Sequence, residues 1–165
     1  MSDTSPPHRT SNPDAQFETY TLLKGGGGDD VLVFDGADTL TVEGDAGIDT
    51  LRIDGAGVTL DLTLATNQHL QGIERFDLTA CGANSLVLDV NQLLRLPDHF
   101  GMFVASHTSQ LLVTGQNDDS VTPLDGGWQH DVARIETADA QYQSYTHTGV
   151  AAQLLVQSDL IQALN

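Results

Sequence analysis

The sequence predicts an all-β fold, a parallel β-roll or β-solenoid, and three observations lead to it. Short runs of alternating apolar and polar residues recur along the chain, as in half-buried strands. Glycine and aspartate gather in the turns between these runs. Residues 25–43 and 44–62 form two copies of a 19-residue repeat. Each copy is too short to bury its own apolar face, so successive copies are expected to stack as coils with parallel strand pairing.

The two copies share seven identical positions, which fall in two clusters that mark two turns per copy. The identical pairs are Gly25/Gly44, Gly28/Gly47, Asp30/Asp49, Leu32/Leu51, Asp35/Asp54, Gly36/Gly55 and Ala37/Ala56. The residues between the turns predict strands at 31–34 and 39–42, matched by 50–53 and 58–62. Stacking then places Asp30 over Asp49 at the inter-strand spacing of about 4.8 Å.

Carboxylates stacked this closely repel, and a cation between them would offset the repulsion. Calcium suits such a turn, because it accepts about six to eight oxygen ligands from carboxylates and main-chain carbonyls. Glycine adopts positive φ at low cost and lets a turn direct its carbonyls toward an ion. The sequence therefore predicts a calcium site at the turns that carry Asp30 and Asp49.

The remaining chain is expected to continue the same architecture. Residues 1–18 are read as a flexible lead-in and 19–165 as one domain, with calcium-binding coils at 25–62 and metal-free coils and a C-terminal cap at 63–165. Strands are predicted at 75–79, 85–90, 102–106, 111–114, 132–136, 142–147 and 151–157. Other predicted elements are a helical turn within 66–73, a short helix at 91–96, a turn at 125–128 and a capping helix in the tail "SDLIQALN".

The charge balance is strongly acidic, with 23 acidic against 6 basic residues and a net charge of -17. This excess argues against nucleic-acid and anionic-membrane partners, which require Lys and Arg. No apolar run approaches the roughly 20 residues of a membrane span, so no membrane insertion is expected. A solvated acidic surface is the simpler explanation of the charge, but it does not explain why Asp so often adjoins Gly.

Motifs for catalysis are absent from the sequence, and no enzymatic activity is expected. There is no H-E-x-x-H, no G-x-S-x-G, and no G-K-[ST] after the four-glycine run. The single cysteine, Cys81, excludes an intrachain disulfide and a cysteine-based zinc cluster. Asp118 and Asp119 suit either a second calcium loop or a solvated turn. The solvated turn is preferred, because no copy stacks on them.

The repeat resembles the nonapeptide G-G-x-G-x-D-x-U-x of the RTX (repeats-in-toxin) family, in which U is a large apolar residue. Residues 25–33, "GGGGDDVLV", match it throughout, and 44–52, "GDAGIDTLR", match it with Asp45 at the second glycine. The resemblance implies calcium bound between coils by Asp30 and Asp49. It also implies loop carbonyls as ligands, near Gly26, Gly28, Asp45 and Gly47. On the opposite edge the weaker candidates are Asp35, Gly36, Asp38 and Asp54, because Gly57 replaces an expected acid.

Residues 57–63, 70–96, 125–129 and 142–156 resemble the C-terminal region of very large bacterial adhesins exported by type I secretion. This resemblance implies a secreted or surface-displayed protein, exported by the type I secretion machinery without an N-terminal signal peptide. The expected function is a calcium-dependent folding and capping module that carries the C-terminal export region and acts in cell adhesion or biofilm formation. Two alternatives stay open: a calcium-dependent domain that binds a peptide or sugar ligand on a host or cell surface, and the RTX tail of a secreted enzyme.

Overall fold

The computed structural model describes residues 20–36, 39–64, 69–96, 108–137 and 140–162. The fold is all-β, as predicted, with one short helix in the described part of the chain. The elements are β1 (Tyr20–Gly27), β2 (Val31–Phe34), β3 (Thr39–Ala46), β4 (Thr50–Ile53), β5 (Thr59–Asp61), β6 (His69–Gln71), β7 (Arg75–Asp77), β8 (Ser85–Leu88), α1 (Val90–Arg95), β9 (Ser109–Thr114), β10 (Ser120–Pro123), β11 (Trp128–Glu136), β12 (Gln141–His147), β13 (Ala152–Gln157) and β14 (Ile161–Gln162). No described helix is long and apolar enough to cross a membrane.

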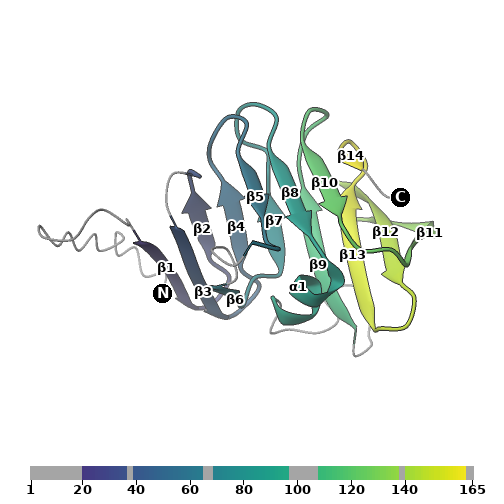
Figure 1. Ribbon diagram of the computed structural model, residues 1–165, viewed down its shortest axis with the longest axis horizontal. Helices are drawn as coiled ribbons and strands as arrows, with labels where there is room; N and C mark the ends of the chain where they lie inside the picture. The colour runs from purple at the N-terminus through teal and green to yellow at the C-terminus, as the bar shows by residue number, and fades with distance from the viewer. Residues whose placement is uncertain (1–19, 37–38, 65–68, 97–107, 138–139, 163–165) are drawn as a thin grey trace, which may run out of the picture.

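The strands form three sheets, and strands that follow one another in the chain mostly belong to different sheets (Figure 1). The sheets β1-β3-β6 and β14-β10-β8-β5 contain parallel pairs only. The third sheet, β11-β12-β13-β9-β7-β4-β2, is mixed, because β12 pairs in antiparallel fashion with both β11 and β13. We call one passage of the chain through the sheets a coil.

The register of the first two coils follows the repeat. Strand β2 pairs in parallel with β4, and Val31 lies opposite Thr50. Strand β1 pairs in the same way with β3, and Gly26 lies opposite Asp45. The bounds predicted for β2 and β4 and their parallel pairing are confirmed. Later coils contain longer loops, so that Thr50 lies opposite Arg75, which in turn lies opposite Leu112.

One row of buried side chains crosses the large sheet from coil to coil. It consists of Leu32, Leu51, Phe76, Val113 and Val156, each opposite the next in the neighbouring strand. Strand residues alternate between the two faces, so every second side chain joins the common core. Burial of each large aliphatic side chain contributes roughly 1.5–3 kcal/mol. The repeated leucines of the sequence therefore serve as the inner face of stacked strands.

The short helix is confirmed at α1. Asp89 caps its N-terminus, and Gln92 completes a capping box. Two other helical predictions are wrong. Residues 69–71 of the expected helical turn form strand β6, because pairing with β3 buries Leu70 between exposed neighbours. The tail at 158–162 forms a turn and strand β14 beside β10. The lead-in at 1–18 and the strand at 102–106 lie outside the described residues.

Strands β4 and β7 are also joined by an ion pair between Arg52 and Asp77, with Nε 2.8 Å from Oδ2. Burial raises the pKa of the Asp77 carboxyl, but hydrogen bonds from Thr79 and Arg52 outweigh burial, so this pKa lies below its ordinary value. A folded-state pKa below the unfolded one means that ionised Asp77 stabilises the fold above about pH 4. The stabilisation is lost as pH falls through the folded-state pKa.

We therefore expect Asp77→Asn to reduce the dependence of stability on pH on the acid side. The difference in urea midpoint between about pH 5 and about pH 3 should be smaller than in the unchanged protein. Asp54→Asn, at an exposed carboxylate, is the matched control and should keep the original pH dependence. An unchanged pH dependence in Asp77→Asn would contradict the lowered pKa of Asp77.

Candidate functional site

The ends of β1 and β3 lie over one another, as do the turns that follow them, and several of these residues have the positive φ expected of glycine loops. Gly26 has φ 96° and Gly28 has φ 109°. Asp45, opposite Gly26, has φ 66° and is the one non-glycine residue with positive φ in the described chain. Aspartate tolerates this region better than most residues, because its short side chain can hydrogen-bond locally. Asp45 thus adopts the conformation of the glycine that it replaces in the repeat.

These turns pack backbone against backbone. The N–H of Gly28 donates to the carbonyl of Ala46 over 2.7 Å. A Cβ atom placed on Gly47 would lie 2.2 Å from the carbonyl oxygen of Gly28, and one placed on Gly25 would lie 2.7 Å from that of Gly44. Such distances admit only glycine. The carbonyl oxygens of each turn therefore lie directly against the neighbouring turn.

Three acidic residues from successive coils form what we call the Asp30 column: Asp30, Asp49 and Glu74. Asp49 Oδ1 accepts the N–H of Asp30 over 2.9 Å, and Glu74 Oε2 accepts the N–H of Asp49 over 2.9 Å. Asp49 and Glu74 are fully buried. The structure brings Asp30 and Asp49 together as the repeat predicts. The carboxylates of Asp49 and Glu74 each accept a main-chain N–H of the coil before them, so main-chain N–H groups offset part of the predicted repulsion.

Asp30 is the first residue of this column along the chain. Its Oδ2 atom is buried and has no hydrogen-bond partner among the described residues. A Cβ placed on Gly25 would lie 3.2 Å from Asp30 Oδ2 and 2.7 Å from the Gly44 carbonyl oxygen, so both oxygens border the space at Gly25. Burying a carboxylate oxygen without a partner is costly. A carboxylate and a main-chain carbonyl are also the oxygen ligands that calcium accepts.

The donor set at this turn fits calcium, provided that main-chain carbonyls supply most of the ligands. No group of three or more His, Cys, Asp or Glu side chains that could hold a metal occurs in the described part of the chain. Of the predicted carbonyl donors, Gly26 and Asp45 lie opposite one another at the ends of β1 and β3, and Gly28 and Gly47 lie in the turns that follow. The nearby Asp29 is engaged otherwise, because its Oδ1 accepts the N–H of Ile48 over 2.9 Å.

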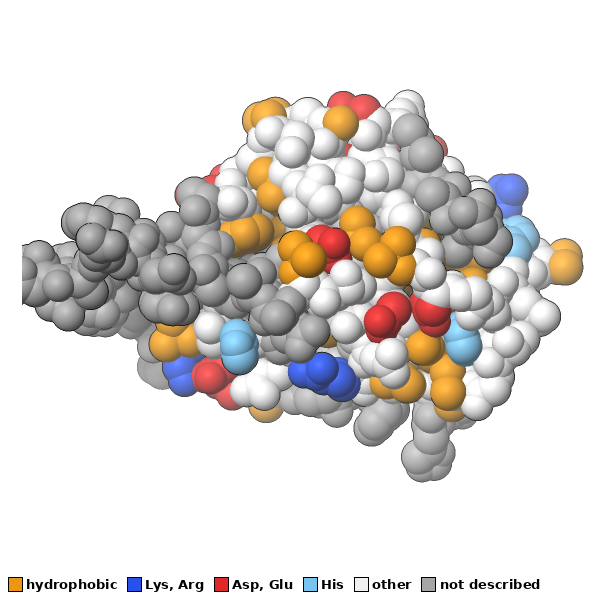
Figure 2. Space-filling view, viewed as in Figure 1, with side chains coloured by type: hydrophobic (Ala, Val, Ile, Leu, Met, Phe, Trp, Pro, Cys, Tyr) orange, Lys and Arg blue, Asp and Glu red, His pale blue; other side chains and the backbone are white. Residues whose placement is uncertain are grey.

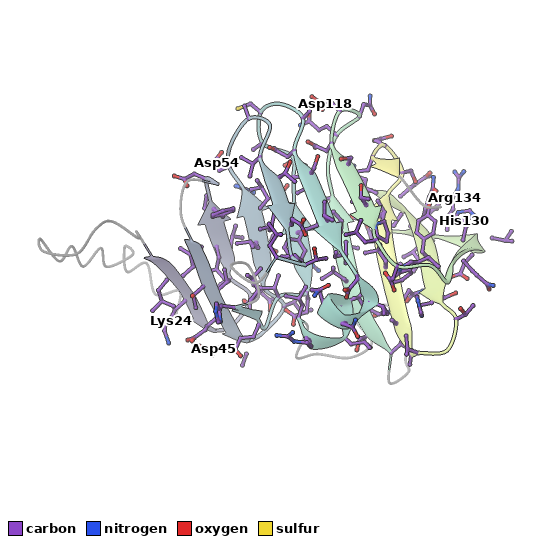
Figure 3. All side chains as sticks on the ribbon, viewed as in Figure 1. Lys24, Asp45, Asp54, Asp118, His130 and Arg134 are labelled. Atoms are coloured by element: carbon purple, nitrogen blue, oxygen red, sulfur yellow. The ribbon has the colours of Figure 1, made fainter. Side chains whose placement is uncertain are left out.

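The charge around these turns is negative. The single lysine, Lys24, pairs with Glu43 on the adjacent strand, and this hydrogen bond raises the pKa of Lys24. Figure 3 shows Lys24 and Asp45 at the same end of the molecule. On the face shown in Figure 2, acidic side chains occur in several places, and the Lys and Arg side chains form no continuous patch. This distribution favours cationic ligands.

The opposite edge of the same coils is built differently. Asp35 and Asp54 are exposed there. The side chain of Val58 lies against Gly36, which has φ 84°, and a Cβ on Gly36 would lie 2.9 Å from Val58 Cγ1. The structure therefore places an apolar side chain beside this turn and does not gather Asp35 and Asp54 into a buried group. Asp38 lies outside the described residues.

A second column of side chains that accept main-chain N–H groups lies at a different set of turns, and the sequence did not predict it. Asn84 Oδ1 accepts the N–H of Val58 over 2.9 Å, and Asp119 Oδ1 accepts the N–H of Asn84 over 2.8 Å. Asp119 is fully buried, and its Oδ2 accepts the N–H of Gln116 over 2.7 Å. The predicted solvated turn is thus wrong for Asp119, although Asp118 is exposed. Asp119 stacks on Asn84, whose side chain is an amide and not an acid. A search for repeated acidic residues therefore does not find this column.

Comparison of the chain with protein-family models, with curated proteins and with solved structures finds no match. The description of the candidate site therefore rests on the geometry of this structure alone. Two stacked glycine turns lie beside an acidic column, and the buried Oδ2 atom of Asp30 in that column has no hydrogen-bond partner among the described residues.

Proposed function

We propose that this chain is a calcium-stabilised β-solenoid module of an RTX-like secreted protein, with a structural rather than a catalytic role. The observation that carries the proposal is the buried Oδ2 of Asp30 at the head of an acidic column, which borders the space at Gly25 as the Gly44 carbonyl oxygen does. The parallel pairing of the first two coils at the spacing of the repeat supports the solenoid. The antiparallel strands β11 and β12 then act as its C-terminal cap.

In this proposal calcium couples folding to the cell exterior. A net charge of -17 opposes compaction, and a bound cation lowers that repulsion. The chain would stay largely unfolded at low cytosolic calcium, pass through a type I secretion system and fold outside. The resemblance of its later segments to adhesin C-terminal regions supports this route, with the export signal in the same part of the chain.

Calcium is therefore expected to raise the melting temperature of the full chain. A ligand that binds only the folded state adds about 2.7 kcal/mol at a hundredfold excess over Kd. For a domain of this size that corresponds to a rise of roughly 5–10 °C. Melting followed by circular dichroism in EDTA, in millimolar magnesium and in millimolar calcium measures it. Equal melting temperatures in magnesium and calcium would show charge screening alone, and the proposal would be wrong.

Asp30→Asn identifies the site within the same experiment. Without calcium this variant should be as stable as the unchanged protein or more so, because it removes an unpaired buried charge. With calcium it should lose most of the stabilisation, because a carboxylate ligand is missing. Asp54→Asn removes the same charge from an exposed position and should keep the calcium response. Equal calcium responses in the two variants would place the ion elsewhere.

A further inference from the structure

His147 lies at the end of β12, against the turn that connects β10 to β11. Its Nε2 atom is 3.2 Å from Asp125 Oδ2 and 3.0 Å from the carbonyl oxygen of Gly126. The side chain of His147 is 12% exposed, and that of Asp125 is 26% exposed. One imidazole nitrogen, largely shielded from water, therefore has two oxygen atoms of the turn close to it.

The turn approaches the imidazole more closely than a residue with a side chain would allow. Gly127 has φ 106°, and a Cβ placed on it would lie 2.9 Å from His147 Nε2 and 3.0 Å from Thr148 Oγ1. Glycine adopts this φ without strain. The Gly127 carbonyl accepts the N–H of Thr148 over 2.9 Å, which fixes the turn to the end of β12. The backbone therefore sets the geometry around Nε2 before any ligand binds.

Hydrogen bonds also fix the Asp125 carboxylate. Its Oδ1 atom accepts the indole N–H of Trp128 over 3.1 Å and the main-chain N–H of Val90 over 3.2 Å. The other oxygen, Oδ2, is the one next to His147, and it is buried without a hydrogen-bond partner among the described residues. Burial of a carboxylate oxygen without a partner is costly. The carboxylate is thus held in one orientation, with its unsatisfied oxygen beside the imidazole.

A proton on Nε2 cannot satisfy both oxygens, whereas a metal ion can. A single N–H donates to the Gly126 carbonyl and leaves Asp125 Oδ2 without a hydrogen bond. Zinc binds imidazole nitrogen and carboxylate oxygen at about 2.0–2.2 Å, so two ligands at an angle of about 90–110° lie roughly 2.8–3.5 Å apart. Both distances from His147 Nε2 fall in this range. Its Nδ1 atom is buried and has no partner among the described residues in either state, so it favours neither.

We propose that His147, Asp125 and the Gly126 carbonyl bind a divalent transition-metal ion of the zinc class. Nε2 and Oδ2 are the side-chain ligands, the carbonyl oxygen is the third, and water completes the coordination. The ion fastens the end of β12 to the turn before β11, and through Asp125 Oδ1 this turn is joined to the first residue of α1. The site goes beyond the proposed calcium function and does not depend on the turns at Asp30, because calcium prefers oxygen ligands alone.

Titration of the full chain with zinc chloride, followed by the fluorescence of Trp128, tests the proposal. Trp128 is the single tryptophan of the chain, and its ring centroid lies 5.2 Å from that of His147. In buffer that contains millimolar calcium, zinc should change this emission in one saturating transition, and magnesium should not. The imidazole NMR signals of His147 should shift over the same range of zinc concentration. This second measurement uses the unchanged protein, so it does not depend on the folding of any variant.

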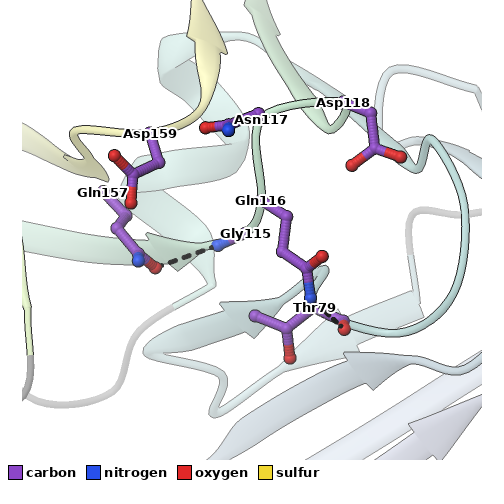
Figure 4. Close-up of a pocket in the computed structure, with 7 residues that line it drawn as sticks. All are labelled: Thr79, Gly115, Gln116, Asn117, Asp118, Gln157 and Asp159. Carbon is purple, nitrogen blue, oxygen red and sulfur yellow. Dashed lines mark hydrogen bonds between the residues drawn. The ribbon is translucent and has the colours of Figure 1, made fainter.

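Matched variants separate this site from general attraction of zinc to an acidic protein. His147→Gln and Asp125→Asn should each weaken zinc binding at least about tenfold, since loss of a ligand costs no less than loss of an outer-shell partner. His130→Gln removes an exposed imidazole from β11, and Asp118→Asn removes an exposed carboxylate from the open pocket shown in Figure 4. Both controls should bind zinc as the unchanged protein does, and circular dichroism verifies the fold of each variant. Equal losses in the controls, or no shift of the His147 signals at millimolar zinc, would overturn the proposal.

Discussion

Replacement of Gly44 by alanine is expected to unfold the N-terminal coils. A Cβ atom at this position would lie 1.8 Å from the carbonyl oxygen of Gly72 and 2.7 Å from Asp49 Oδ2. The nearer obstacle is backbone, so no side-chain rotation relieves it, and β3 must separate from β6. We expect a loss of more than about 3 kcal/mol in the free energy of unfolding. Urea unfolding followed by circular dichroism measures the loss.

Gly27→Ala is the matched control, because it lies in the glycine run at the equivalent strand end of the preceding coil. No atom lies within 4 Å of a Cβ placed there, and Gly27 is not among the glycines with positive φ. Its free energy of unfolding should change by no more than about 0.5 kcal/mol. If the two alanine variants were equally stable, the turns would not be stacked in the way described.

The register of the first coils could be predicted because spacing and residue type agree there. Two copies of one length place Leu32 opposite Leu51, and alternation identifies their strands. The same core row continues through Phe76 and Val113, but loops of different length precede these residues. A repeat can be found in a sequence only where the spacing is constant. Stacking requires only that each strand lies in register beside the strand of the preceding coil, whatever the length of the loop between them. The later coils could therefore be predicted as strands but not assigned a register.

Strand direction could be predicted only for the first coils. The expected continuation of the parallel roll to the C-terminus is wrong at β12, which is antiparallel to both β11 and β13. Alternating apolar residues predict that 132–136 and 142–147 are strands, and both are confirmed as parts of β11 and β12. Alternation is identical in parallel and antiparallel pairs, so it gives no direction. The short connection after Glu136, closed by the hydrogen bond from Thr137 N–H to the Ala140 carbonyl, turns the chain back on itself. This reversal makes the large sheet mixed.

The candidate site was partly predictable for a related reason. Asp30 and Asp49 are the same residue at the same place in two copies, so their proximity followed from the repeat. Glu74 and Asn84 also accept main-chain N–H groups at coil corners, but they differ in type and spacing. Any side chain with an acceptor oxygen can make this hydrogen bond. Acids in the turns thus have two uses, as main-chain acceptors and as candidate cation ligands.

Asp119 gives the clearest test of an acidic side chain as a main-chain acceptor, because its neighbour Asp118 has the same chemistry in a different environment. Asp119 is fully buried and accepts the N–H groups of Asn84 and Gln116, whereas Asp118 is exposed. Asp119→Ala leaves the buried N–H of Asn84 and the partly buried N–H of Gln116 without an acceptor, and a donor buried in this way costs about 1–3 kcal/mol. We expect the free energy of unfolding to fall by about 2–4 kcal/mol.

The loss in Asp119→Ala should also be local. Amide hydrogen exchange should accelerate first at Asn84 and Gln116, because their N–H groups lose the protecting carboxylate. Asp118→Ala removes one negative charge from the adjacent position and should change stability by no more than about 0.5 kcal/mol. Similar losses in the two variants would mean that charge reduction, rather than the hydrogen bonds of the second column, sets the stability of this corner. A larger loss in Asp119→Ala would show that an acidic side chain can serve this fold as a main-chain acceptor without a cation.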